Sequence, residues 1–169
     1  ISFGTELSYR HNTPLNSTVL GIAPGLPAQG ETKGPRGNTF HGLLNAVGVV
    51  PKTPLFDTAA WAAEVTWSRW DKVTSGQNLF FAEGFAACAG KDKWDGCTTK
   101  DFFGAAVSFT PTWFQVWPGI DLSAPISYAV GLKGNAATIF GGNQGNGNYS
   151  VGLGMDVQQK YRFDLKYID

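Results

Sequence analysis

Charged residues are scarce in this chain of 169 residues, because Asp, Glu, Lys and Arg make up only 15% of it. An ordinary soluble protein has about 25%. Basic and acidic residues balance at 13 each, so the net charge is zero. Proteins that bind nucleic acid need a basic patch that can release counterions from the phosphates. The composition therefore argues against a nucleic-acid partner.

Long apolar runs are also missing, and no stretch reaches the roughly 18 residues that a transmembrane helix requires. No helical segment of confident length and no internal repeat can be recognised. Glycine is abundant, with 22 residues, and aromatic residues make up 14% of the chain. These residues favour strands, tight turns and membrane-interface belts. A β-barrel crosses a bilayer with strands of about ten residues that are only half apolar, so the missing run does not exclude it.

Histidine and cysteine occur only twice each. His11 and His41 belong to no Ser-His-Asp arrangement and are far in sequence from Cys88 and Cys97. We therefore expect no enzymatic activity, no cofactor and no metal site. The two cysteines enclose a polar stretch of eight residues with two glycines, a spacing that favours a disulfide in an oxidising compartment. The alternatives are two free thiols or half of a metal site.

The last twenty-one residues, Tyr149–Asp169, have the clearest pattern. Apolar residues alternate with small, polar or charged residues up to Gln158, and the alternation resumes at Tyr161 after a short turn. A period of two predicts a β-strand with one apolar and one polar face. Two such strands around a turn of about three residues predict a hairpin. Strands whose apolar face meets lipid and whose polar face meets water are typical of a transmembrane β-barrel.

Further strands with the same alternation are expected upstream, which makes about seven antiparallel strands joined in chain order. They are expected over Ser2–Arg10, Thr39–Val50, Phe56–Lys72, Phe102–Trp117, Leu122–Lys133 and the two arms of the terminal hairpin. Pro111 lies within one of them and implies an edge position, a bulge or a kink. We expect a single domain over residues 1–169.

Three stretches are expected as loops. The first spans 11–38, holds four prolines and has room for a short strand at Thr18–Ile22. The second is the cysteine loop, 86–100. The third is the Gly/Asn-rich stretch 134–148, which lacks the Lys-Ser/Thr of a phosphate loop and is expected to form a flexible tip or turn.

Several stretches, found in order along nearly the whole chain, resemble an uncharacterised family of Gram-negative outer-membrane β-barrel proteins, catalogued as domain of unknown function 1302. They are E-L-S-Y-R-H-N-T-P-L from Glu6, D-x-A-x-W-x-x-E-x-x-W from Asp57, D-G-C-T-T, G-I-D-L-S-A-P-I-S-Y from Gly119, and S-V-G-L-G with D-L-K-Y-I-D. The resemblance implies an outer-membrane location. Members of that family are much longer, and outer-membrane barrels usually end on an aromatic residue where this chain has Asp169. We therefore expect the C-terminal portion of a larger barrel.

Two sets of residues follow from the alternation. Candidates for the water-filled lumen are Glu6, Arg10, Glu64, Asp156, Arg162, Asp164 and Lys166. Candidates for the lipid-facing surface and its aromatic girdle are Trp61, Trp67, Trp113, Tyr149, Leu153, Tyr161, Phe163 and Tyr167. Glu64 could bind a cationic group, or form a salt bridge with Arg69 or with a lysine of a neighbouring strand. The other lumen candidates would form a ladder of charges if their strands were neighbours.

These features favour a porin-like barrel, or part of one, that offers a small apolar molecule a passage or docking wall in the cell envelope. The expected partners are outer-membrane lipid and lipopolysaccharide, together with the remainder of the same barrel or other envelope transport components. The alternative is a secreted β-sandwich that binds a carbohydrate or another protein, with the aromatic residues in its core.

Overall fold

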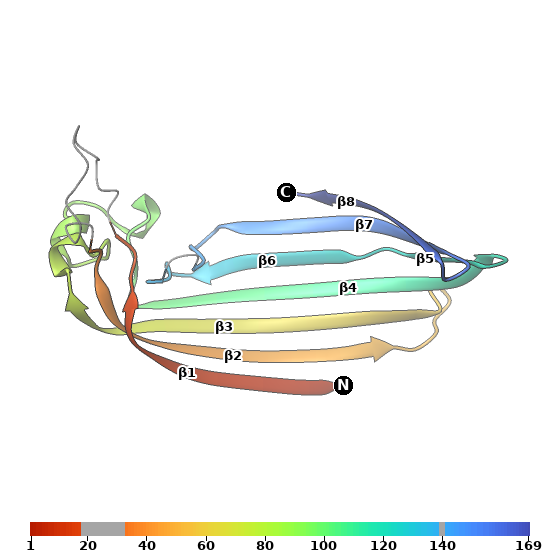
Figure 1. Cartoon of the computed structure of the whole chain (residues 1–169), viewed down its shortest axis with the longest axis horizontal. Helices are drawn as coiled ribbons and strands as arrows, with labels where there is room; N and C mark the ends of the chain where they lie inside the picture. Colours follow the sequence, from red (N-terminus) through yellow and green to blue (C-terminus); the bar gives the residue numbers. More distant parts are fainter. Residues whose placement is uncertain (18–32, 139–140) are drawn as a thin grey trace.

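The computed structural model describes residues 1–17, 33–138 and 141–169, which form one antiparallel sheet of eight strands (Figure 1). The strands are β1 (Ser2–Pro14), β2 (Arg36–Val50), β3 (Thr58–Ser75), β4 (Asp101–Trp117), β5 (Ile120–Ser123), β6 (Ile126–Lys133), β7 (Gly147–Val157) and β8 (Tyr161–Ile168). The short 3-10 helices are η1 (Gln77–Leu79), η2 (Ala86–Cys88) and η3 (Lys93–Asp95). The expected all-β fold and antiparallel meander are confirmed.

The terminal hairpin has the expected form. β7 pairs with β8 from Ser150↔Ile168 to Val157↔Tyr161, and the chain reverses over residues 158–160. Gln158 and Gln159 both adopt left-handed backbone conformations, which suit the twist of a tight hairpin turn. The alternation therefore predicted both the strands and the place of the turn.

The strand expected over Leu122–Lys133 is two strands, β5 and β6, separated at Ala124–Pro125. β5 pairs with the end of β4, and β6 pairs with the middle of β4. Pro111 of β4 lies opposite this interruption, and its carbonyl accepts a hydrogen bond from the Ala124 amide. The N–H and C=O of a strand residue point the same way, so the missing N–H of Pro111 faces the interruption and breaks no bond to β3. β4 continues through Pro111 in unbroken register with β3, so the irregularity lies in the adjoining strands β5 and β6 and not in β4 itself.

β1 and β2 both extend into the stretch 11–38 that was expected to be a loop. β1 continues through Pro14 after a register shift between Arg10 and Thr13, and Asn12 adopts a left-handed conformation there. The Arg36 guanidinium donates to the Asn12 carbonyl at 2.6 Å, which holds the two strand ends together. These contacts lie between residues distant in sequence, so composition could not reveal them. The short strand expected at Thr18–Ile22 lies outside the described residues.

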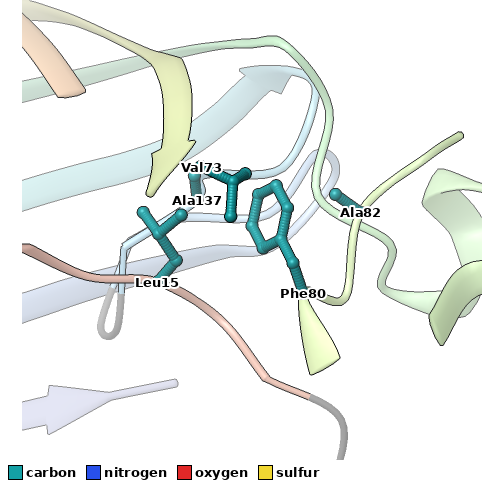
Figure 2. Close-up of a cluster of buried hydrophobic side chains, with 5 residues drawn as sticks. All are labelled: Leu15, Val73, Phe80, Ala82 and Ala137. Carbon is teal, nitrogen blue, oxygen red and sulfur yellow. The ribbon is translucent and has the colours of Figure 1, made fainter. Parts of the chain in front are cut away.

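The hydrophobic core lies in a cap of loops at one end of the sheet (Figure 1). Figure 2 shows its five members, Leu15, Val73, Phe80, Ala82 and Ala137, which come from four separate segments. Phe80 is fully buried and packs edge-on against Trp70 and Phe85, with ring centroids 5.5 and 4.9 Å apart. The connection between β3 and the cysteine loop, which carries Phe80 and Ala82, therefore forms the centre of this cap.

The expected disulfide is present between Cys88 and Cys97, whose Cα atoms are 6.1 Å apart. The buried Asn135 side chain donates to the carbonyls of Cys97 and Lys93 at 2.9 and 2.6 Å, which joins the cysteine loop to the β6–β7 connection. At the other end of the sheet, the β2–β3, β4–β5 and β7–β8 connections are short. Long connections therefore gather at one end and short turns at the other. None of the described helices is long and apolar enough to cross a membrane.

Candidate functional site

The strand register divides the sheet into two faces of opposite chemistry. In an antiparallel pair, residues directly opposite each other have side chains on the same face. On β3, Val65 lies opposite Leu44 of β2 and Ala105 of β4, whereas Glu64 lies opposite Asn45 and Ala106. We call the face of Val65 the apolar face and the face of Glu64 the polar face.

The register divides the fifteen candidate residues between the two faces of the sheet. The register links Trp61, Trp67, Trp113, Tyr149, Leu153, Tyr161, Phe163 and Tyr167 to the apolar face. It links Glu6, Arg10, Glu64, Asp156, Arg162, Asp164 and Lys166 to the polar face. The two sets therefore belong to opposite sides of one sheet.

The charged candidates do not form one ladder. Arg162 donates to Asp156 at 3.2 Å and to Asp164 at 2.9 Å, so these three form a local cluster on β7 and β8. Glu6 and Arg10 lie on β1, at the opposite edge of the described sheet, with the other strands between them and β8. The ladder was expected only if these strands were neighbours, and β1 and β8 are not neighbours in the described sheet.

Glu64 does not pair with Arg69, which corrects one of the expectations. The two side chains lie on opposite faces, because their positions differ by an odd number of residues. Arg69 instead forms an ion pair with Asp101 at 3.3 Å, and Asp101 also accepts a hydrogen bond from the Trp67 indole at 3.0 Å. No basic side chain of the described residues lies within ion-pair distance of Glu64. Its carboxylate is free to meet a ligand on the polar face.

Three adjoining clefts follow the polar face. The first, of about 430 Å³, is lined by Glu64, Thr66, Phe102 and asparagines of the β6–β7 connection. The second, of about 310 Å³, adjoins it at Thr66 and Phe102, and is lined also by Glu6, Arg10 and His41. The third, also about 310 Å³, continues the first toward the short turns and shares Glu64 with it. Together they form a trough along the strands, which we call the polar trough.

Segment 141–148 lies against the polar face and forms one side of the trough. Two glycines permit this approach. A Cβ atom on Gly131 would collide with the Asn143 carbonyl, and a Cβ atom on Gly142 would collide with the Phe102 ring. Gly131 also donates to Asn146 and accepts from Gly145, at 2.8 and 2.9 Å. The stretch expected to be a flexible tip is therefore fastened to the sheet, because glycine lets two backbones come close.

Polar anchors also hold the short turns. Asp57 accepts from Lys52 at 2.6 Å and from the Phe114 amide at 2.9 Å. Both hydrogen bonds lower the pKa of the Asp57 carboxyl, the one from Lys52 most. The Trp113 indole donates to the Leu55 carbonyl at 2.6 Å. The Trp113 indole therefore has a polar partner beside the apolar face.

Sequence reasoning missed His41, Phe102 and Asn143 as members of the trough. His41 lies within β2, in the strand expected over Thr39–Val50, and its Nε2 is 2.9 Å from the Thr39 hydroxyl. Counting by two along β2 from Asn45 would have placed it on the polar face. Asn143 offers no such signal, because its position depends on the fold of the β6–β7 connection.

Among the residues that the structure describes, no group of three or more His, Cys, Asp or Glu side chains could hold a metal ion. A family model described as "Protein of unknown function (DUF1302)" matches residues 1–169. No curated protein and no solved structure matches the chain.

Proposed function

The chain belongs to the DUF1302 family, and from this premise we propose that it forms part of the wall of an outer-membrane β-barrel in a Gram-negative bacterium. The wall gives a small molecule a passage or a docking surface across the cell envelope. Lipid covers the apolar face, and water or the transported molecule occupies the polar trough.

One observation supports this proposal above all, which is that the apolar face has no protein cover among the described residues. Its side chains are largely exposed, including Phe3 at 78%, Leu165 at 75% and Leu153 at 63%. The buried hydrophobic residues are few and lie mainly in the cap. Exposed apolar patches of this extent mark a surface that meets a membrane or another apolar partner. A lipid bilayer supplies such cover to every strand at once.

The β-sandwich alternative requires a second sheet packed about 10 Å from the first, against its apolar face. The described residues form one sheet only. Moreover, the aromatic residues that would fill a sandwich core are exposed, as Tyr161 and Phe163 are at 64% and 58%. The geometry therefore favours the barrel wall over the sandwich.

Both edges of the described sheet need a partner in a bilayer. β1 and β8 each pair on one side only, and unpaired N–H and C=O groups are costly in a hydrocarbon environment. We therefore include in the proposal that further strands, the remainder of the same barrel, pair with these edges. Other envelope transport components are its further candidate partners.

The polar trough suits a small molecule with an apolar body and a few polar groups. Phe102, Leu43 and several alanines line it, beside the carboxylate of Glu64 and asparagine side chains. Ligand sites commonly combine an apolar lining with a few polar groups that fix orientation. In this proposal Glu64 accepts a hydrogen bond from the molecule as it passes.

Folding in two solvents tests the proposal. The full chain, unfolded in urea, is diluted into plain buffer or into zwitterionic detergent micelles, and β-structure is followed by circular dichroism. We expect cooperative folding in micelles and aggregation in buffer. A soluble monomer that unfolds cooperatively in plain buffer would overturn the membrane assignment and restore the β-sandwich.

A further inference from the structure

A further cleft, of about 670 Å³, lies at the cap end of the sheet and shares only Trp67 with the lining of the polar trough. Trp67, Arg69, Asp101 and Phe103 line it, and the register places all four on the apolar side of β3 and β4. Trp67 and Phe103 are opposite each other, and Arg69 and Asp101 form the next pair toward the cap. We call this the cap cleft.

Basic side chains outnumber acidic ones in the cap cleft. The basic residues are Arg69, Lys93, Lys100 and Lys133, and the acidic residues are Glu83 and Asp101. Because Asp101 is the ion-pair partner of Arg69, three lysines remain against the single carboxylate of Glu83. Lys93 and Lys100 come from the cysteine loop and Lys133 from the end of β6, and the fold brings them to one place.

The lysine ammonium groups keep donors available for an anion. Lys93 donates to the Gln144 side chain and Lys100 to the Asp71 carbonyl, both at 3.0 Å. An ammonium has three N–H donors, so each retains others. Lys133 is exposed and has no acidic partner among the described residues. Burial, followed by repulsion from Arg69, lowers the pKa of Lys100, and a bound anion would relieve that repulsion.

The surroundings of the cap cleft point to a ligand that is anionic at one end and apolar at the other. On the side away from the cap, the apolar face begins at Trp67 and Phe103 and continues along the strands. On the other side of the charged residues lies the cap, with the disulfide and the long connections (Figure 1). An anion held by the lysines would have its apolar part beside the exposed side chains of that face. A free inorganic anion would make no use of the adjoining apolar surface.

We propose that the cap cleft binds the phosphomonoester headgroup of a membrane lipid whose acyl chains lie along the apolar face. This inference rests on the proposed function, because it needs lipid beside that face. The lysines and Arg69 donate charge-assisted hydrogen bonds to the phosphate oxygens. The site lies at the end with the long connections, so its lipid belongs to the leaflet on that side of the membrane.

Lipid titration of the full chain, folded in zwitterionic micelles, tests this site. Short-chain phosphatidic acid is the probe, with matched phosphatidylcholine and inorganic phosphate as separate titrations, and tryptophan fluorescence reports binding. We expect saturable binding of phosphatidic acid alone. Lys133→Gln and Lys93→Gln should each weaken it about fivefold, since a basic residue contributes about 1 kcal/mol toward an anionic lipid. Lys160→Gln, in the exposed β7–β8 turn at the other end of the sheet, is the matched control and should leave binding unchanged.

Each other outcome has a defined meaning. Equal binding by wild type and both cleft variants would overturn the site, and so would equal binding of phosphatidylcholine. Inorganic phosphate binding as tightly as phosphatidic acid would overturn the lipid assignment. A chain that folds in micelles but fails these comparisons refutes the cap cleft alone. A chain that folds as a soluble monomer in plain buffer refutes the proposed function instead.

Discussion

Replacing Val65 by Arg puts a cation near the centre of the apolar face, on a strand with neighbours on both sides. Val65 is already 48% exposed. If water covered this face, Val65→Arg would change the free energy of unfolding by less than about 0.5 kcal/mol. In a bilayer, an arginine facing lipid costs about 2–4 kcal/mol at the midplane and about 0–1 kcal/mol near the interfaces.

The position of Val65 between two tryptophans narrows the range of free-energy cost expected for the arginine. Trp61 and Trp67 are on the same face, four residues before Val65 and two residues after it. A rise of about 3.3 Å per residue separates the two tryptophans by about 20 Å along the strand. If the two tryptophans mark the two interfaces of the membrane, Val65 lies slightly away from the midplane, toward Trp67. We expect a loss near the lower end of the midplane range, about 2 kcal/mol, equivalent to about thirtyfold in the folding equilibrium constant.

Glu64→Arg is the matched control, because it introduces the same side chain one residue away on the polar face. Glu64 has no ion-pair partner among the described residues and lines two of the clefts, so an arginine there stays in water. We expect a change below about 0.5 kcal/mol. Urea titrations of the full chain in micelles, followed by tryptophan fluorescence, measure both variants. Equal losses for the two variants would refute the assignment of the faces.

Three further predictions concern the cap and the trough. The double variant Cys88→Ser, Cys97→Ser opens a short loop whose ends are nine residues apart, and should destabilise the cap by about 2–3 kcal/mol. We expect the cysteine loop of this variant to be proteolysed faster than that of the wild type. Unchanged rates of proteolysis would contradict this prediction. Phe80→Ala removes a ring that is 0% exposed and should cost about 3–5 kcal/mol, measured by hydrogen exchange of the cap amides; unaltered protection would show that the cap has no cooperative core. Gly131→Ala should push Asn143 off the sheet and raise hydrogen exchange in segment 141–148, while β8 stays protected.

The alternation of apolar and polar residues along the chain predicted much of the sheet from the sequence alone. Wherever apolar and polar residues alternate, as in Tyr149–Val157, the strand, its faces and its turn all follow from a period of two. The same rule divides the charged and the aromatic candidates between the two faces of the sheet. The prediction needed no long-range information, because side-chain direction in a strand is set by position alone.

The remaining features depend on contacts between segments far apart in sequence. The extension of β1 through Pro14 rests on its pairing with Arg36. The division at Pro125 follows from the change of partners along β4. The shape of the polar trough depends on segment 141–148. The close contact between Gly142 and the Phe102 ring joins two distant parts of the sequence, so the sequence alone could not reveal it. The Arg69–Asp101 ion pair likewise joins two strands. Composition and period carry no information about such partners.

Solvent accessibility along β7 tests the central claim most directly. The full chain is reconstituted in phospholipid vesicles with a spin label placed in turn at each position from Ser150 to Asp156, and collisions with oxygen and with a water-soluble nickel complex are measured. The native cysteines are joined in the disulfide and do not take the label. We predict oxygen access at Val151, Leu153 and Met155, and nickel access at the positions between them. Nickel access without a period of two would contradict a wall with lipid on one face and water on the other.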